Sequence, residues 1–293
     1  MGLICIGLVA IVAGIIVSIT HPSAYSTSFS EKLDNAVGNS IFTNEDVSPT
    51  DTSIDGVEYR YVAVTDSERF YNSECLGEGH IILGTNVKDS AVEVYALCSL
   101  AGYGFRDGML VDNTGFSCVP TLITFEKTDS GEYIYKKTKT PEEGSHFASS
   151  VKKMFPAALA EKAISAHGTE EYYSRLKEQC DAYAAAYLKV LGRKAKITSY
   201  REQNFQMLSN YGVSADVENK LCKLHPEYGF YLGSFELLEP DGRYVYSIKW
   251  DGDDSGNGKV IYQKIRYDTD EVMEKFAYRI EGEKLSEIKQ KKK

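Results

Sequence analysis

The chain has 293 residues, of which 43% are hydrophobic and 26% charged, a balance typical of one large or two small globular domains rather than of a disordered protein. Its formal net charge of -9 argues against nucleic acid as a partner, because phosphate binding needs a basic surface. The one basic run, at residues 289–293, is interpreted as a solvated tail.

Residues 3–20 (LICIGLVAIVAGIIVSIT) contain no charged side chain, and the first charged residue of the chain is Glu31. A helix of this length spans about 27 Å, close to the roughly 30 Å of a bilayer's hydrocarbon core. A buried core helix would show a polar stripe, whereas here only Ser18 and the ends are polar. We therefore expect residues 1–20 to be a transmembrane segment, inserted through residues 3–20.

An uncleaved anchor is favoured over a cleaved signal peptide. Signal peptides begin with a basic region and end at a small-x-small cleavage site. Met1 and Gly2 supply no positive charge, and the run around Pro22 is a poor cleavage context. Neither flank is basic, so the charges do not set the orientation. Export is the default for a single N-terminal segment, and we expect a single-pass protein of the cell membrane with an extracytoplasmic C-terminal domain.

Residues 21–55 are rich in Ser, Thr, Asn, Asp and Pro and contain few large apolar residues. Such a composition is typical of a flexible connection, so we expect a stalk here and a folded domain over residues 56–293.

The first part of that domain, residues 56–140, shows the period of strands. Residues 59–64 and 91–100 are β-branched or aromatic and are bounded by turn formers. Residues 121–127 and 132–137 flank a Thr-Asp-Ser-Gly turn, which predicts a hairpin.

Residues 146–225 are predicted to be helical. A helix over 151–155 is followed by Pro156, which is suited to begin another. The strongest helix runs over 170–191, with Thr169 as its N-cap and Gly192 at its end. A shorter helix over 216–224 begins after Ser214.

Residues 226–285 return to the strand period and predict a β-meander. Residues 243–250 alternate between aromatic or aliphatic and polar side chains, and 260–267 and 273–280 continue the pattern. Together the three parts predict an α+β fold, with an antiparallel sheet packed on a few helices.

Catalytic motifs are missing from the sequence. It contains no His-Glu-x-x-His, Gly-x-Ser-x-Gly, phosphate-loop or Cys-x-x-Cys pattern, so we expect no enzymatic activity and no cofactor. The segment from Cys75 to His80, with Glu78 between them, has metal-ligand residue types, but a glycine-rich turn before a strand explains it better. The five cysteines beyond Cys5 are interpreted as small core residues, and one disulfide among them remains compatible with the sequence.

The loop over residues 251–258 (DGDDSGNG) is the most ligand-like stretch. Asp251, Asp253 and Asp254 resemble the start of a calcium loop, in which oxygen ligands converge in a tight turn. The bidentate Glu expected at the twelfth position is replaced by Tyr262. A long hairpin turn also needs Asp, Asn and Gly, so we favour the turn and keep calcium as the alternative.

Tyrosine is unusually frequent, with 21 residues against one Trp. Tyrosine combines apolar area with a polar tip, which suits both half-exposed sheet faces and recognition surfaces. Most of these residues are interpreted as sheet packing. An exposed row of Tyr103, Phe105, Tyr133 and Tyr135 is the candidate ligand-binding face.

Four stretches of the domain share the texture of a known family: residues 79–111 (GHIILGTNVKDSAVEVYALCSLAGYGFRDGMLV), 119–125 (VPTLITF), 153–156 (KMFP) and 227–250 (EYGFYLGSFELLEPDGRYVYSIKW). They resemble the C-terminal extracytoplasmic region of membrane metallopeptidases of Gram-positive bacteria, relatives of the β-lactam sensor-transducer (antirepressor) proteins. The resemblance covers most of residues 56–285 and implies the last helix and the external domain of such a protein. The peptidase part and its zinc motif have no counterpart here, so no catalytic residue is carried over.

The sequence thus leads to three hypotheses. The first is a membrane-anchored, extracytoplasmic sensor or ligand-binding domain without catalysis, whose partner is a small molecule, a cell-wall component or another membrane protein. The second is a truncated relative of a membrane metallopeptidase regulator that acts only with a partner membrane protein. The third is a hydrolase whose site is not recognisable from sequence.

Overall fold

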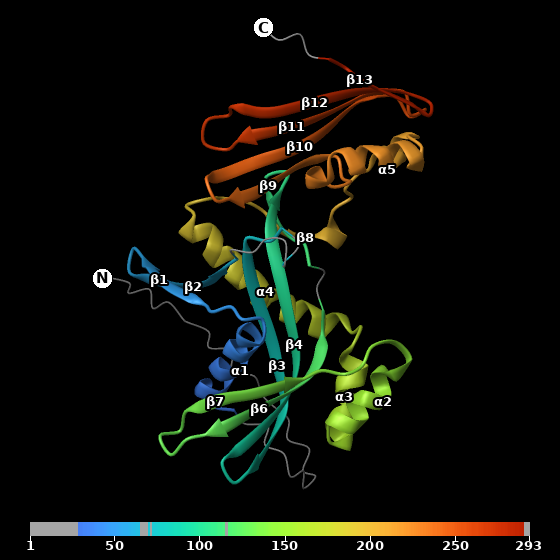
Figure 1. Cartoon of the computed structure of the whole chain (residues 1–293). Coiled ribbons are helices and arrows are strands. Elements are labelled where there is room, and N and C mark those ends of the chain that lie inside the picture. The colour runs from blue at the N-terminus through green and yellow to red at the C-terminus, as the bar shows by residue number, and fades with distance from the viewer. Residues whose placement is uncertain (1–28, 65–69, 71, 115–116, 290–293) are drawn as a thin grey trace, which may run out of the picture.

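The chain folds into an α+β architecture in which helices cover a large, mostly antiparallel sheet, and this confirms the expected fold class (Figure 1). The computed structural model describes residues 29–64, 70, 72–114 and 117–289. Within these residues lie five α-helices: α1 (Glu31–Asn44), α2 (Phe147–Met154), α3 (Ala157–Ala166), α4 (Glu170–Val190) and α5 (Ala215–Leu224). The same residues form thirteen strands: β1 (Thr50–Ile54), β2 (Val57–Ala63), β3 (Cys75–Lys88), β4 (Ala91–Arg106), β5 (Met109–Asp112), β6 (Val119–Lys127), β7 (Tyr133–Lys139), β8 (Ile197–Ser199), β9 (Gly233–Glu239), β10 (Gly242–Gly252), β11 (Gly258–Arg266), β12 (Val272–Glu281) and β13 (Lys284–Glu287).

Strand β4 joins the two halves of the sheet. Residues 91–103 of this 16-residue strand pair with β3 along one edge, while the other edge pairs first with β6 and then with β5. Its last residue, Arg106, also pairs with Phe235 of β9, and the meander from β9 to β13 follows from there. Figure 1 shows the meander at one end of the long β3–β4 hairpin and α2 and α3 at the other.

Helix α4 packs directly on β3 because β3 presents glycine to it at two positions. A Cβ atom at Gly77 would stand 2.4 Å from the carbonyl oxygen of Cys180, and one at Gly79 would stand 2.5 Å from that of Leu176. Only glycine permits such an approach between a strand and a helix backbone. Helices α2 and α3 extend this layer, and the core beneath the three helices includes Leu97, Tyr103, Phe105, Leu110, Val151, Leu176 and Tyr187.

Helix α1 covers the opposite face of the sheet. The Ser30 hydroxyl accepts a hydrogen bond from the Leu33 N–H and caps the helix. Leu33 and Val37 are buried against Val94, Ile123 and neighbouring apolar residues of β4 and β6. The stalk expected over 21–55 is therefore wrong for residues 31–54, which form α1 and β1. A few apolar side chains at helical spacing are enough to dock this otherwise polar segment.

The free edge of β3 is covered by a side chain. Strand β2 pairs with β3 only at Leu76 and Cys75. Further along, the side-chain amide of Gln179 on α4 bonds the backbone of His80 twice. Its Oε1 accepts from the His80 N–H at 3.0 Å, and its Nε2 donates to the His80 carbonyl at 3.0 Å. Gln179 thus occupies hydrogen-bonding positions that a neighbouring strand would use.

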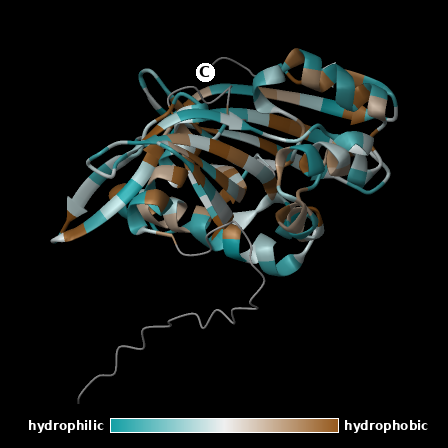
Figure 2. Ribbon diagram, turned by 90° about the horizontal axis from the view of Figure 1, so that it is seen from below, coloured by the Kyte–Doolittle hydropathy of each residue, from teal (hydrophilic) through white to brown (hydrophobic). Residues whose placement is uncertain are grey.

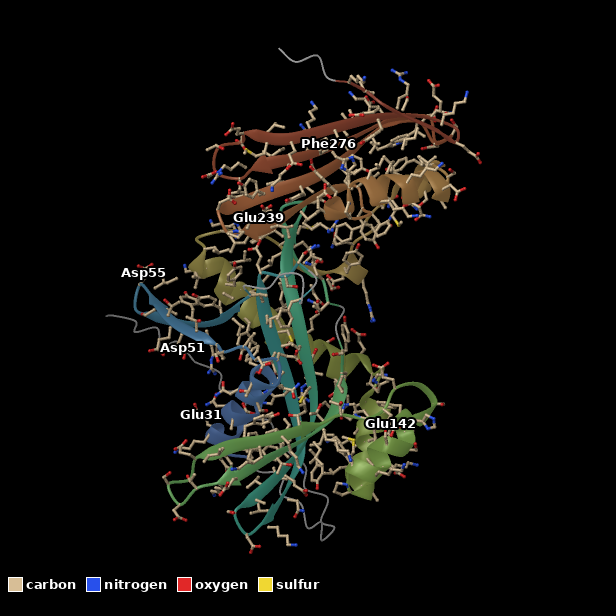
Figure 3. All side chains as sticks on the ribbon, viewed as in Figure 1. Glu31, Asp51, Asp55, Glu142, Glu239 and Phe276 are labelled. Atoms are coloured by element: carbon tan, nitrogen blue, oxygen red, sulfur yellow. The ribbon has the colours of Figure 1, made fainter. Side chains whose placement is uncertain are left out.

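The C-terminal meander has its own aromatic core, covered by α5. Tyr228, Tyr246 and Tyr262 pack edge to face, with ring centroids 5.1 and 5.2 Å from that of Tyr228. Buried His225 lies 4.4 Å from the ring of Phe276, which Figure 3 shows on β12. In Figure 2 the hydrophobic segments gather on the central strands and hydrophilic residues fill the peripheral loops.

The predicted helices and hairpin agree well with these elements. Helix α4 begins after Thr169, as predicted, and ends one residue before the predicted end at 191. Helix α5 begins after Ser214, whose hydroxyl accepts from the Val217 N–H. Strands β6 and β7 form the predicted hairpin. The five described cysteines are unpaired, and all but Cys222 are buried.

The expected transmembrane segment, residues 1–20, and the first residues of the expected stalk, 21–28, lie outside the described residues. Among the helices that the structure does describe, none combines the length and the apolar character needed to span a bilayer.

Candidate functional site

The aromatic row expected as a ligand-binding face does not form one surface. Tyr103 and Phe105 are each only 1% exposed and belong to the core beneath α4, where the Tyr103 hydroxyl donates to Asp181 at 2.8 Å. Tyr133 and Tyr135 lie on β7 and pack edge to face on Phe125. The expectation of an exposed row is wrong for Tyr103 and Phe105, because β4 is covered by α4 on that face.

The loop containing Asp251, Asp253 and Asp254 closes on itself as the turn between β10 and β11. One oxygen of Asp253 accepts from the Ser255 N–H at 2.9 Å, from the Ser255 hydroxyl at 2.6 Å and from the Asn257 N–H at 3.2 Å. These bonds lower the pKa of Asp253. Because the oxygen already has three donors, the geometry matches the hairpin turn that we favoured.

The segment from Cys75 to His80 is part of strand β3 rather than a turn before it. Side chains alternate between the faces of a strand, so Cys75 points to the opposite face from Glu78 and His80. Cys75 is indeed buried in the core under α4. Among the described residues, no group of three or more His, Cys, Asp or Glu is placed to hold a metal ion.

Glu78 and His80 instead form a hydrogen-bonded cluster with α1 and α4. His80 Nδ1 lies 2.9 Å from Glu78, and Nε2 lies 3.2 Å from Asp34. The Tyr183 hydroxyl donates to Glu78 at 3.1 Å. Burial opposes the charged form of His80, but the two carboxylates more than offset it and raise its pKa to about 9. Both ring nitrogens are occupied, so His80 has no free nitrogen with which to act as a general base on a substrate.

A cavity of about 500 Å³ lies where β4 meets β9. We call it the junction cavity. Its walls come from β4, β9, the segment before β3, the segment after β5 and the turns around 200 and 226–231. The lining includes Asn72, Phe105, Arg106, Asn113, Tyr200, Glu227, Tyr228, Tyr231, Phe235 and Glu236. A volume of this size whose walls combine aromatic rings with polar groups is within the range of small-molecule sites.

Arg106 lines the junction cavity, and its guanidinium lies against aromatic rings. Its Cζ lies 5.0 Å from the ring centroid of Phe205 and 5.5 Å from those of Tyr231 and Phe235. Two of its nitrogens, Nε and Nη1, are buried and have no hydrogen-bond partner among the described residues. Burial lowers the pKa of this guanidinium. The rings supply cation–π attraction, which replaces only part of the solvation that the charge has lost.

A neutral ion-pair network lies next to the junction cavity. Glu236, which lines the cavity, accepts from Arg193 at 2.7 and 2.8 Å and from Arg243 at 2.9 Å. Arg243 also donates to Glu74 at 2.7 Å. The Arg193 guanidinium stacks 3.6 Å from the ring centroid of Phe105. Two arginines thus balance two glutamates, and the network ties the residue before β3 to β9 and β10 through partly buried bonds.

Arg106 is not part of this ion-pair network. The neighbouring Asp107 turns to β9, where its carboxylate accepts from the Ser234 N–H at 2.6 Å and from the Ser234 hydroxyl at 3.1 Å. No carboxylate among the described residues lies within ion-pair distance of Arg106. The junction cavity therefore has a positive, incompletely satisfied wall.

Comparison with known proteins adds no relative to this picture. No family model matches the chain, and no curated protein or solved structure matches it either. The arguments about function therefore rest on the geometry described above.

Proposed function

We propose that the protein is a membrane-anchored, extracytoplasmic sensor or ligand-binding protein without catalytic activity, and that the junction cavity is its binding site. The observation that carries this proposal is the cavity itself, with about 500 Å³ of space between aromatic walls and one incompletely satisfied arginine. Buried polar atoms without partners are rare in folded proteins and call for an explanation. A ligand that binds here would supply one.

The position of the cavity supports a sensing role. Phe105 and Arg106 come from β4, while Phe235 and Glu236 come from β9. These strands meet at a single residue pair, Arg106 with Phe235. A ligand that contacts both strands would bias how the meander sits on the β3–β4 hairpin. A ligand shifts such an equilibrium only by its difference in affinity between two arrangements, and a site at the junction is suited to produce that difference.

The anchor and the location are part of the same proposal. They are supported by the uncharged residues 3–20 and by the resemblance to the extracytoplasmic region of antirepressor membrane metallopeptidases. That resemblance also supports a partner membrane protein as the receiver of the signal. Protease treatment of intact cells that express the chain tests the orientation. Digestion of the folded domain before lysis is expected, and complete protection until lysis would contradict export.

A thermal-shift screen of the full chain in detergent tests the binding site. A ligand at about a hundred times its Kd stabilises the folded state by roughly 2.7 kcal/mol, which is readily measured. The variant Asn113→Trp fills the cavity from its wall, and Lys249→Trp places the same ring on an exposed position of β10. Ligands of the site are expected to stabilise wild type and Lys249→Trp but not Asn113→Trp. Equal shifts in all three proteins would show that the cavity is not the site.

A further inference from the structure

The guanidinium of Arg106 limits what the junction cavity can bind. It is a permanent cation, because an arginine side chain stays protonated even when burial lowers its pKa. Its Nε and Nη1 atoms are buried N–H donors without an acceptor in the part of the chain that the structure describes. The other two arginines near the cavity, Arg193 and Arg243, are already neutralised by Glu236 and Glu74. A ligand at this wall thus meets a guanidinium that has no carboxylate within ion-pair distance among the described residues.

We infer that the junction cavity binds a small monocarboxylate whose body is flat and apolar, with the carboxylate on Arg106 and the body between the aromatic walls. This inference rests on the proposed function, because it names the ligand class of that same site. Guanidinium and carboxylate match in planar, two-pronged geometry, and such charge-assisted pairs are stronger than neutral hydrogen bonds.

A single charge on the ligand fits the walls better than a phosphate does. Among the described residues that line the cavity, Arg106 is the one cation, and Glu227 and Glu236 add negative charge to the same walls. Glu236 is paired with arginines, whereas the Glu227 side chain is 42% exposed and lies 3.7 Å from His225. A doubly charged group would gain one attraction and meet two acidic residues, so the lining disfavours phosphate esters.

The aromatic rings define the rest of the ligand. Phe105, Tyr228, Tyr231 and Phe235 all line the cavity. Flat rings prefer offset-stacked or edge-to-face contacts with one another, so an aromatic body suits these walls. The rings of Phe205 and Tyr231 also cover the guanidinium, and both lie on segments between regular elements rather than inside a helix or long strand. Nε and Nη1 are covered in this structure, so a carboxylate that binds them requires one of these rings to turn aside.

Three probes with the same ring test the inference on the full chain in detergent: benzoate, benzamide and phenyl phosphate, each at millimolar concentrations. Affinity is measured by thermal shift and by calorimetry. Benzoate is expected to bind more tightly than the other two. In Arg106→Met the affinity for benzoate is expected to fall at least about tenfold, as for loss of a charge-assisted bond. The matched control Arg279→Met, at a side chain that is 65% exposed, is expected to bind benzoate as wild type does.

A readout without ligand shows whether Arg106→Met folds. Since Arg106 has no ion pair to lose among the described residues, the variant is expected to melt at the wild-type temperature or above it. A lower melting temperature would mean that Arg106 is a structural residue, which would overturn its assignment to the ligand.

The outcomes separate the two proposals. If benzamide binds as well as benzoate, or if Arg106→Met keeps its affinity for benzoate, the carboxylate inference fails while cavity binding stands. Tighter binding of phenyl phosphate would also overturn it. If none of the three binds, the inference fails, and the wider screen with Asn113→Trp then decides on the proposed function.

Discussion

Deprotonation of His80 at high pH is expected to weaken its interactions with Asp34 of α1 and with Glu78, and thereby to lower the free energy of unfolding. The pKa of His80 rises from an ordinary 6.5 to about 9 in the folded protein. Burial opposes the charge, and the hydrogen bonds to Asp34 and Glu78 outweigh it. A histidine whose folded pKa is raised contributes its full stabilisation below the unfolded pKa and loses it as the pH rises through the folded pKa. The relevant window is therefore pH 6.5 to 9.

The size of the effect follows from the same shift. Each pKa unit corresponds to about 1.4 kcal/mol, so the free energy of unfolding is expected to fall by at most about 3 kcal/mol across this window. The His80 side chain is only 8% exposed, but Asp34 is 62% exposed, and solvent screening of that pair makes the fall smaller. Urea denaturation of the full chain in detergent, followed by far-UV circular dichroism across the window, measures it.

Two variants check the cause. His80→Gln cannot titrate, so its free energy of unfolding should stay nearly level between pH 6.5 and 9. Asp34→Asn removes one of the two carboxylates and should shift the loss of stability to lower pH. If wild type and His80→Gln lose the same stability across the window, the His80 cluster is not the source and the reasoning is refuted.

Three further predictions concern packing, ion pairs and the β10–β11 turn. Gly79→Ala should lower the free energy of unfolding by about 2 kcal/mol or more in urea titrations, because its Cβ would stand 2.5 Å from the carbonyl oxygen of Leu176; an unchanged midpoint would show that α4 can move away at little cost. Arg243→Met should cost about 3–5 kcal/mol by leaving the buried carboxylate of Glu74 without its arginine, while Arg279→Met at an exposed pair should cost less than about 1 kcal/mol; equal costs would contradict the role assigned to the ion-pair network. Asp253→Ala should lower the melting temperature by releasing three hydrogen bonds, and millimolar calcium or a chelator should leave wild-type melting unchanged; a rise with calcium would revive the calcium alternative.

The elements that the sequence predicts well are those whose pattern is local. Helix α4 has an N-cap residue, two acidic residues in its first turn and apolar residues at helical spacing. Strand β4 is a nearly unbroken apolar run, and α5 follows a capping serine. These signals need no knowledge of the rest of the chain.

The errors arise where tertiary contacts override local signals. Gly77 and Gly79 suggested a turn, yet they lie within β3. Because they have no side chain, the backbone of α4 can approach the backbone of the strand at these two positions. Residues 31–44 looked like a polar stalk, although Leu33 and Val37 dock α1 on the sheet. A closer look at the spacing of those two residues could have indicated the helix.

The junction cavity was not foreseen, although Phe105 was among the candidate residues. Its walls come from segments that are distant in sequence, among them β4 and β9, which pair at Arg106 and Phe235. The one available signal was an arginine at the end of a long apolar strand, where a charge has few local partners. Nothing in a single sequence shows that Tyr231 and Phe205 cover that arginine.

The contact between Gln179 and the backbone of His80 bears on whether copies of this chain remain separate. An unpaired strand edge in a sheet of this size is a template onto which a second molecule can add its own strand. The Gln179 amide satisfies both backbone groups of His80, at a point where β2 no longer covers β3. At this point of the edge, one side chain on a helix therefore occupies the groups to which a second strand would bond. Anchored molecules share a two-dimensional surface and meet often, so such protection would matter more to them than to dilute molecules in solution.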